Sequence, residues 1–341
     1  MRKEYRILVV GLLVSIFYSA CVPVPPPQAA APAPKTLKVL ILPFLSFAPY
    51  FIAQENGYFA EQGLEVEFVQ MQQGTEAIPA LVQSQIDVYG GFINAGLLNA
   101  ISQDVNVKLV ADKGYIATTS CGADDFMTPQ NKAIQSALAD ASQRANLRFS
   151  ANTASVEGYF ISQLVAPFGM TLNDVRIEYI ADPAAELDAL NNGAIDVALV
   201  SEPWVTRITQ ADAGQVWQPV SAIAPDFQSG IIAFGPTLLT EDRAAGERFM
   251  VAYLKAVQKF AEGKTDRNVA IIAQYTKLDP ALLRDMCWTT FRGDGSINTA
   301  SITEFADWAR ENNLLDTVPT PAIFWDGSFV DFANKALGTT P

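Results

Sequence analysis

Short apolar runs alternate with longer segments of helical periodicity along most of the chain. The runs predict strands at 37–42, 64–70, 86–90, 107–111, 146–150, 175–180 and 195–200. The segments between them predict helices at about 48–62 (broken at Gly57 and ended at Gly63), 75–84, 131–142, 155–168 and 184–192. Strands that alternate with helices indicate an α/β protein in which the sheets are mostly parallel.

One pattern occurs twice. Residues 80–88 read ALVQSQIDV and residues 189–197 read ALNNGAIDV, 109 residues further on. The segments before them, 63–81 and 173–190, share an alternating strand, a polar loop and an Ala/Leu helix. Units of strand, helix and strand look alike in any α/β protein, but ALxxxxIDV at the same place in both favours two lobes of one topology.

The order of elements predicts how the chain is divided. We expect residues 37–117 and 229–341 to form the first lobe and residues 118–228 the second. An extended crossing at 116–122 and a return strand at 228–235 connect them, and helices at 240–262, 266–275, 280–287 and 300–312 complete the first lobe. Two crossings predict a two-strand hinge, with the cleft between the lobes as the ligand site.

The N-terminus has the pattern of a secretory signal. MRKEYR is basic, and ILVVGLLVSIFY is apolar but too short to span a bilayer in the mature protein. Ser19 and Ala20 lead into Cys21, which resembles the bacterial lipobox, whose cysteine is lipidated, although Tyr18 stands where leucine is usual. We expect residues 1–20 to be a lipoprotein signal peptide; ordinary signal-peptidase cleavage near Ala20 is the alternative.

A segment rich in proline and alanine follows. VPVPPPQAAAPAPK (22–35) is typical of a semi-rigid polyproline spacer, which would reach on the order of 40 Å at ~3.1 Å per residue. We expect residues 21–36 to tether the protein, through Cys21, to the outer side of the cell membrane. Cys121 and Cys287 then stand in a compartment that permits disulfides, and the sequence leaves open whether they are bridged or are two buried thiols.

Composition narrows the classes of function. The net charge is −13 and no cluster of Lys and Arg appears, which argues against a nucleic-acid partner. The chain has no histidine, which excludes Ser-His-Asp and Cys-His catalysis and histidine-based zinc sites. We therefore expect a binding protein without cofactor or metal, not an enzyme, although carboxylate, lysine or cofactor chemistry stays open.

The first helix and strand carry a family resemblance. APYFIAQENGYFAEQGLEVEFV (48–69) resembles the opening of the ABC-importer solute-binding proteins for sulfonates, nitrate, thiamine pyrimidine precursors and riboflavin. The family pattern is met by Pro49, Tyr50, Ala53, Gly57, Tyr58, Phe59, Gly63, Leu64 and Val66. IDVYGG (86–91), NVKLVA (106–111), SEPW (201–204), the helix at 238–260 and the closing FWDGSFVDFANKAL (324–337) follow in the family's order.

The resemblance, which covers about residues 37–336, implies a two-lobed type II periplasmic-binding fold. It also implies a monomer that captures a solute between its lobes and delivers it to an ABC permease. A related enzyme branch makes the thiamine pyrimidine and consumes an active-site histidine. This chain has none, so that branch is disfavoured.

Ligand groups in such clefts come from loops at the C-terminal strand ends and from helix N-termini. The candidates are mostly aromatic or neutral hydrogen-bonding residues: Phe44, Ser46, Phe47, Gln73, Gly74, Thr75, Phe92, Asn94, Tyr115, Asn152, Thr153, Ser155, Glu202 and Trp204. Lys113 is the only base in these loops. Thr75 and Ser155 are also explained as helix caps, and Trp204 as lobe packing.

This set of side chains favours a planar heteroaromatic ligand, because rings stack on its faces while Asn, Gln, Ser and Glu bind its edge. LPFLSFAPYF (42–51) stands where the thiamine-precursor branch shows D-W-x-P-N-x-N-H-x-G. We therefore prefer riboflavin or a related flavin. A sulfonate or nitrate bound to backbone N–H groups at 74–75 or 153–155, and a pyrimidine precursor, are the alternatives.

Overall fold

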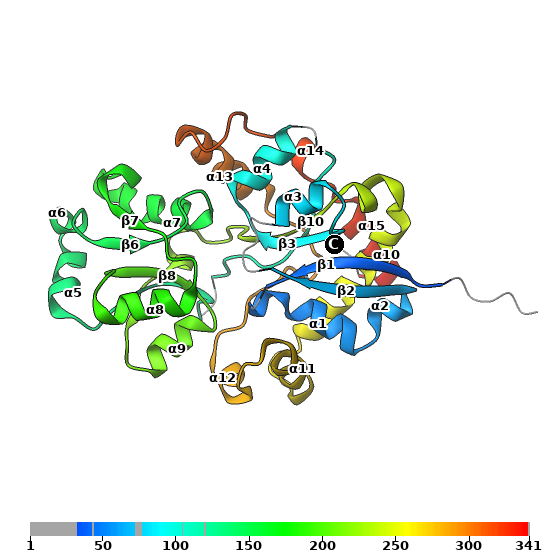
Figure 1. Ribbon diagram of the computed structural model, residues 1–341, viewed down its shortest axis with the longest axis horizontal. Coiled ribbons are helices and arrows are strands. Elements are labelled where there is room, and N and C mark those ends of the chain that lie inside the picture. The colour runs from blue at the N-terminus through cyan, green and yellow to red at the C-terminus, as the bar shows by residue number, and fades with distance from the viewer. Residues whose placement is uncertain (1–32, 43, 72–76, 104, 119–120, 340–341) are drawn as a thin grey trace, which may run out of the picture. The chain divides into compact units, whose positions relative to one another are not determined.

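Two five-stranded sheets organise the chain in a computed structural model that describes residues 33–42, 44–71, 77–103, 105–118 and 121–339 (Figure 1). The first sheet has the order β2-β1-β3-β10-β4 and the second β7-β6-β8-β5-β9. The strands of the first are β1 Lys35–Ile41, β2 Leu64–Gln70, β3 Val88–Phe92, β4 Lys108–Asp112 and β10 Gly230–Phe234. Those of the second are β5 Asp124–Thr128, β6 Arg148–Ser150, β7 Arg176–Glu178, β8 Val197–Ser201 and β9 Gln215–Pro219.

Both sheets have the same strand directions. β1 is parallel to β2 and β3, whereas β10 is antiparallel to β3 and β4. In the second sheet β6 is parallel to β7 and β8, whereas β5 is antiparallel to β8 and β9. The predicted α/β class and mostly parallel sheets are thereby confirmed.

Helices fill the connections. They are α1 Ala48–Glu55, α2 Tyr58–Glu61, α3 Ala77–Val82, α4 Ala95–Ser102, α5 Lys132–Ala139, α6 Ala141–Arg144, α7 Val156–Val165, α8 Pro183–Asn192, α9 Trp204–Gln210, α10 Arg243–Phe260, α11 Asp266–Thr276, α12 Pro280–Asp285, α13 Thr299–Glu311, α14 Pro321–Phe324 and α15 Ser328–Leu337. Gly57, with φ 74°, separates α1 from α2, as the sequence predicted. None of the helices in the described ranges is long and apolar enough to cross a bilayer.

The sequence predicted neither α4 nor β5 nor β9. β5 begins with Asp124 and Asp125, residues that are rare in strands, and β9 ends in Pro219 at the sheet edge. β1 begins at Lys35, within the predicted tether, because Lys35 pairs with Leu64 of β2. The chain changes sheets between β4 and β5 and between β9 and β10, and the predicted lobe boundaries fall in these two connections.

Alternating residues of the first sheet pack on opposite faces. Val39 and Val110 belong to the apolar core that includes α1 and α10, whereas Leu40 and Leu109 belong to the core that includes α3 and α4 (Figure 1). All four side chains have no exposed surface. This burial of both faces explains why the strands are nearly continuous apolar runs.

The repeated Ile-Asp-Val motif has the same geometry in both lobes. Asp87 accepts a hydrogen bond from the backbone N–H of Lys38 (2.8 Å), and Asp196 accepts one from that of Arg148 (2.9 Å). The backbone N–H of each aspartate in turn donates a hydrogen bond to the carbonyl of the same partner residue, at 2.9 Å in both lobes. The motif therefore fixes its strand to the neighbouring parallel strand, and this shared function accounts for the repeat.

The two crossings between the lobes run side by side. Lys113 N–H donates to the carbonyl of Gly230 (3.1 Å), Gly230 N–H to that of Gly114 (2.8 Å), and Asp226 N–H to that of Ile116 (2.8 Å). Backbone pairing of this kind joins the outgoing and returning segments into a two-stranded connection between the sheets.

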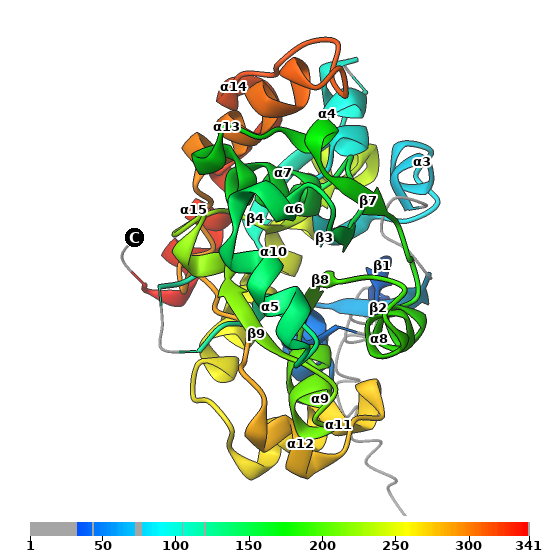
Figure 2. The ribbon, with the colours of Figure 1, turned by 90° about the vertical axis from the view of Figure 1, so that its left-hand side faces the viewer.

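One apolar core continues from lobe to lobe. Tyr159 of α7 stacks on Phe227 of the return crossing, with ring centroids 5.0 Å apart, and contacts Phe305 and Trp308 of α13 edge-on. Figures 1 and 2 show α7 and α13 side by side. Here α13, which was expected only to complete the first lobe, packs against both lobes.

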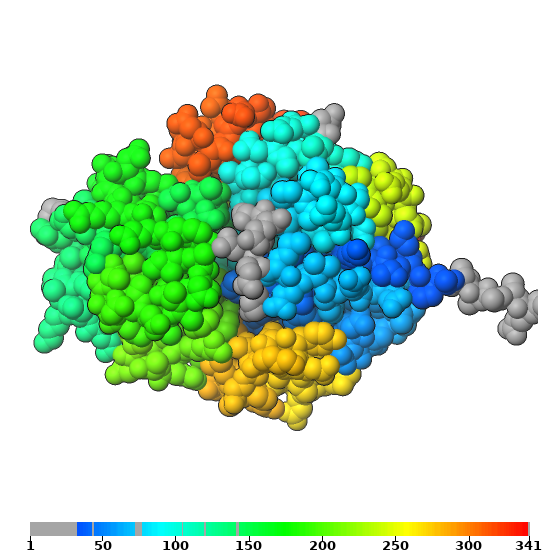
Figure 3. All heavy atoms as spheres, viewed as in Figure 1, coloured from blue at the N-terminus to red at the C-terminus, as the bar shows by residue number. Residues whose placement is uncertain are grey.

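On the opposite side, α12 of the first lobe meets α9 of the second. Gln210 Nε2 donates to Asp285 Oδ2 at 3.1 Å, and the α11–α12 segment adjoins the second lobe in the space-filling view (Figure 3). Nearby, Cys121 of the outgoing crossing is joined to Cys287, just after α12, by a disulfide with a Cα–Cα distance of 5.8 Å. These contacts connect the lobes on both sides of the crossings.

Replacement of Asp196 by alanine is expected to destabilise the fold more than the same change at Asp87. Both changes leave a backbone N–H without its partner, but Asp196 also binds the Arg148 guanidinium at 2.9 and 3.0 Å. We expect losses in the free energy of unfolding of about 2–3 kcal/mol for Asp196→Ala and about 1 kcal/mol for Asp87→Ala in urea titrations. Exposed Asp188→Ala is the control, and equal losses at all three positions would contradict this account.

Removal of the disulfide in the double variant Cys121→Ser/Cys287→Ser is expected to lower the free energy of unfolding by about 2–4 kcal/mol. The reason is that the bridge closes a loop between residues 166 positions apart in the sequence, which restricts the unfolded chain. Thermal melts with and without reductant test this. Reductant should lower the Tm of the wild type and leave that of the variant unchanged; a wild type insensitive to reductant would contradict it.

Candidate functional site

The loop from β6 to α7 forms one wall of the cleft. Ser155 is the N-cap of α7 and accepts a hydrogen bond from Glu157 N–H (3.2 Å), and Asn152 Oδ1 accepts one from Ala154 N–H (3.0 Å). Across the cleft, Asn94 is the N-cap of α4 and accepts from Leu97 N–H (2.9 Å). Ala95 N–H donates to the carbonyl of Ala154 (3.0 Å), so the two capping loops meet in the structure.

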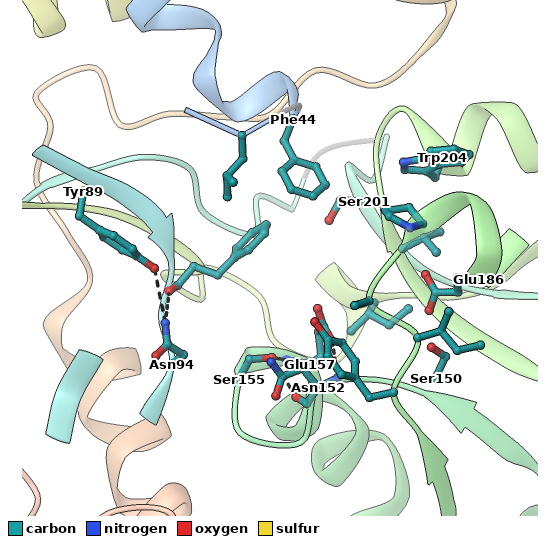
Figure 4. A pocket seen from close by; sticks show the side chains of 18 residues that line it. Phe44, Tyr89, Asn94, Ser150, Asn152, Ser155, Glu157, Glu186, Ser201 and Trp204 are labelled. Atoms are coloured by element: carbon teal, nitrogen blue, oxygen red, sulfur yellow. Dashed lines mark hydrogen bonds between the residues drawn. The ribbon is translucent and has the colours of Figure 1, made fainter. Parts of the chain in front are cut away.

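A cavity of about 160 Å³ lies between the two lobes at this point (Figure 4). The first lobe contributes Leu42, Phe44, Tyr89, Phe92 and Asn94 to its lining. The second lobe contributes Ser150, Asn152, Ser155, Glu157, Tyr179, Ile180, Ala181, Pro183, Glu186, Leu199, Val200, Ser201 and Trp204. Because these residues follow β1, β3, β6, β7 and β8 or end them, the cavity lies at the C-terminal ends of the parallel strands.

Aromatic rings line the cavity from both sides. Phe44 and Phe92 of the first lobe meet edge-to-face with centroids 6.2 Å apart. Trp204 opens α9 of the second lobe, with the guanidinium of Arg207 4.7 Å from its ring centre, and Tyr179 is half-exposed at the rim. Rings on opposing walls are suited to a flat apolar ligand.

Two carboxyl groups face the same cavity. Glu157 lies in the first turn of α7 and Glu186 in the first turn of α8. Burial raises the pKa of Glu157 to about 7, although the Asn152 N–H lowers it. Burial likewise raises the pKa of Glu186 to about 8, with the neighbouring Ser150 hydroxyl lowering it and the charge of Glu157 raising it. Among the residues that line this cavity there is no lysine or arginine.

A smaller cavity continues from the first towards the crossings and shares Phe44, Phe92 and Ser201 with it. Lys113 lies here: its Nζ donates to Ser46 Oγ (2.8 Å) and is 3.7 Å from the ring centre of Phe47. Burial lowers the pKa of Lys113 to about 7, and the charges of Asp112 and Asp124 raise it. In the described residues no three cysteines or carboxylates converge to bind a metal ion.

The predicted site residues separate into several groups. Six line the main cavity: Phe44, Phe92, Asn94, Asn152, Ser155 and Trp204. Ser46 and Glu202 line the smaller cavity, and Tyr115 lies further along the crossing, against the guanidinium of Arg292. Gln73, Gly74 and Thr75, like Cys21, lie outside the described residues.

Three candidates differ from their predicted positions. Phe47 is 1% exposed and belongs to the core, because it begins the buried face of α1. Thr153 is exposed and does not line the cavity. The Glu202 carboxylate, expected to accept from a ligand, accepts from Thr206 N–H (3.0 Å), Thr206 Oγ1 (2.7 Å) and Cys287 N–H (2.9 Å).

The sequence reasoning missed several lining residues. Ser150 and Ser201 are the last residues of β6 and β8, so the strand-end rule would have found them. Glu157 was recognised as an acid of the candidate loop 152–157 but was not selected as a site residue. Glu186 follows the cap of α8 by a few residues, a position at which an acid usually only stabilises the helix start. Tyr89 lies within an apolar strand, where its pattern is that of a core residue.

Comparison with known proteins identifies the family of the chain. The sequence model described as "NMT1/THI5 like" matches residues 45–263, more than half of the chain. The chain belongs to the NMT1/THI5-like family.

Two curated relatives of this NMT1/THI5-like protein have different ligands in their names. The riboflavin-binding protein RibY of Chloroflexus aurantiacus is 38% identical over 78 residues, which are 19% of this chain and 22% of that protein. The bicarbonate-binding protein CmpA of Synechococcus sp. is 27% identical over 201 residues, 53% of this chain and 44% of that protein. The matches thus span less than half the length of either relative.

A solved structure is similar to nearly the whole NMT1/THI5-like chain. The periplasmic nitrate-binding protein NrtA of Synechocystis PCC 6803 has a TM-score of 0.73 at 16% identity, with 90% of each chain covered. At this identity the likeness shows the fold, which is the predicted two-lobed type II periplasmic-binding fold.

Glu186→Gln is expected to reduce the pH dependence of stability of this NMT1/THI5-like protein. The pKa of Glu186 is higher in the folded than in the unfolded state, so the folded state binds more protons between pH 5 and 8 and loses stability as the pH rises through that window. The glutamine stays neutral, so the free energy of unfolding of the variant should gain on that of the wild type by about 3 kcal/mol between pH 5 and pH 8, because most of the rise in the pKa of Glu186 falls in this window and each pKa unit corresponds to about 1.4 kcal/mol.

Urea titrations of the ligand-free proteins at the two pH values measure this gain. Glu178→Gln, an exposed glutamate of β7 outside the cavity, is the control and should follow the wild type. An unchanged pH slope in Glu186→Gln would show that Glu186 is not buried in its uncharged form.

Proposed function

We propose that this protein is an extracytoplasmic solute-binding component of an ABC importer that captures a planar, uncharged heteroaromatic nutrient, with riboflavin or a related flavin preferred. The observation that carries the proposal is the interlobe cavity. It combines aromatic rings from both lobes with the carboxyl groups of Glu186, which is buried, and Glu157, which is partly buried, and it has no cation in its lining.

The aromatic walls support a flat ligand. Phe44 and Phe92 on one lobe and Trp204 on the other give faces and edges on which an isoalloxazine ring could pack. Asn94, Asn152, Ser150 and Ser201 supply neutral hydrogen-bonding groups for the polar edge of a ring or for the hydroxyl groups of a ribityl chain. The similarity of a segment to RibY agrees with this preference but covers too little of the chain to carry it.

The second candidate is a small anion. It is favoured by the longer match to the bicarbonate-binding protein CmpA and by the fold shared with nitrate-binding NrtA. The cavity opposes it, because Glu157 and Glu186 repel an anion as they ionise above about pH 7 and no Arg or Lys of the lining compensates. A pyrimidine precursor has donors that suit the carboxylates but is a smaller ring.

Delivery and anchoring form the rest of the proposal. A captured solute would pass to a membrane permease after the lobes close on it, as their paired crossings permit. Residues 1–20 would direct secretion, Cys21 would carry the lipid, and residues 21–36 would act as the tether. Mass spectrometry of the protein from a bacterial membrane tests the anchor: a diacylated N-terminal Cys21 is expected, and an unmodified N-terminus contradicts it.

A panel of ligands separates the candidates. Riboflavin, an aminopyrimidine, taurine, nitrate and bicarbonate are added to the purified protein, and the Tm and the calorimetric Kd are measured. Riboflavin at micromolar concentration is expected to raise the Tm, since binding to the folded state alone stabilises it. No shift with riboflavin and a clear shift with an anion would replace this proposal by the second candidate.

Trp204→Ala is expected to weaken riboflavin binding by about 1 kcal/mol or more, a rise in Kd of about fivefold or greater, because it removes one aromatic wall. Phe168→Ala is the matched control: Phe168 is 44% exposed, packs on Arg144 and does not line the cavity. Equal affinity of Trp204→Ala and the wild type would remove Trp204 from the site.

A further inference from the structure

The start of α7 already contains an acid where an anionic ligand would bind. Helix N-termini bind anions through free backbone N–H groups, and residues 153–155 were a candidate for that use. In the structure Asn152 N–H donates to Glu157 Oε2 at 2.6 Å, Ala154 N–H to Asn152 Oδ1 at 3.0 Å, and Glu157 N–H to Ser155 Oγ at 3.2 Å. The side chain of Glu157 thus takes the place of an external anion.

Glu186 faces the same cavity from the start of α8 (Figure 4). Glu186 is 8% exposed. Asp182 caps the start of α8 by accepting a hydrogen bond from Ala185 N–H at 2.8 Å. Next to Glu186, Ser150 is 1% exposed and lines the cavity, and its hydroxyl lies beside the Glu186 carboxyl, whose pKa it lowers. A buried hydroxyl and a buried carboxyl side by side, with no cation in the lining, leave acceptor oxygens that donor groups of a ligand can satisfy.

We infer that Glu157 and Glu186 are specificity-determining residues that make the cavity reject anionic solutes and accept the uncharged form of a ligand, bound through its N–H or O–H donors. The inference rests on the proposed solute-binding function and refines it. For a flavin, it means that riboflavin is bound and that its phosphate ester, FMN, is excluded by charge. The site would therefore take a nutrient only after a reaction that removes its phosphate.

The selectivity should depend on pH. The groups that face the two glutamates are each other, Asp124 of β5 and Tyr179 after β7, and none of these is a cation. Because burial raises the pKa of Glu157 to about 7 and that of Glu186 to about 8, the pair gains negative charge between pH 7 and pH 9. The phosphate of FMN is already doubly charged between pH 7 and pH 9. A change with pH in the preference for riboflavin over FMN therefore reflects the ionisation of the protein.

The experiment measures the Kd of riboflavin and FMN by calorimetry at pH 7 and pH 9. The wild type and Glu157→Gln/Glu186→Gln are compared. We expect the wild type to prefer riboflavin at least tenfold at pH 9 and less at pH 7. In the double variant the preference for riboflavin over FMN should fall at least tenfold, and it should no longer depend on pH. Because glutamine has the same size, this loss separates charge from steric exclusion.

Glu178→Gln/Asp188→Asn is the control, since it removes two charges from the same lobe at exposed positions outside the cavity. It should keep the wild-type preference. Wild-type affinities for riboflavin and FMN within threefold of each other at pH 9 would overturn the inference and leave the solute-binding function standing. A preference for riboflavin over FMN that persists in Glu157→Gln/Glu186→Gln would likewise overturn the inference.

If neither flavin binds, the preferred ligand fails but the inference is still tested. Inorganic phosphate, nitrate and bicarbonate at 20 mM are then added to the wild type and to Glu157→Ala/Glu186→Gln, in which the Asn152 N–H, just before α7, loses its carboxylate partner. A rise in Tm in the variant alone supports anion exclusion. A rise in the wild type, or none in either protein, overturns it.

Discussion

A carboxyl group enclosed in a cavity without a cation constrains everything that can bind beside it. Burial makes the ionised form costly, so such a group either retains its proton or obtains hydrogen-bond donors from a ligand. Glu157 and Glu186 face one cavity together; the charge of Glu157 raises the cost of ionising Glu186, and the charge of Asp124 raises that of ionising Glu157. The chemistry of the interlobe cavity follows from this pair more than from any single aromatic ring.

The fold supplies the cavity by repeating one unit twice. In each lobe an Ile-Asp-Val strand is fixed to its parallel neighbour by an aspartate, and the C-terminal ends of these strands meet across the cleft. The two crossings are paired through their backbones, and the aromatic cluster of Tyr159, Phe227 and Trp308 joins the lobes behind the cavity. Two lobes joined by a short, double connection are the arrangement on which hinge closure depends.

The sequence predicted the architecture well because its signals are local and repeated. Apolar strands bounded by glycine, and a motif that recurs after 109 residues, depend only on neighbours along the chain. β5 was missed because its two aspartates disfavour a strand. Its pairing with β8 and β9 comes from distant parts of the chain, which no local pattern contains.

The site was predicted only in part for the same reason. Phe44, Asn94 and Trp204 follow strands, and that rule found them, but the rule also selected Phe47, whose side chain turns into the core. The two glutamates look like ordinary first-turn acids until the cavity shows that nothing neutralises them. Whether a polar residue is buried opposite another is a property of three-dimensional packing. The preference for an uncharged ligand nevertheless agrees with the composition of the loops.

The most direct measurement is a crystal structure of the protein with its tightest-binding solute. The account predicts a flat, uncharged ring in the interlobe cavity, packed between the rings of Phe92 and Trp204, with donor groups directed at Glu157 and Glu186. A ligand bound outside this cavity, or an anion held beside the two glutamates, would contradict it.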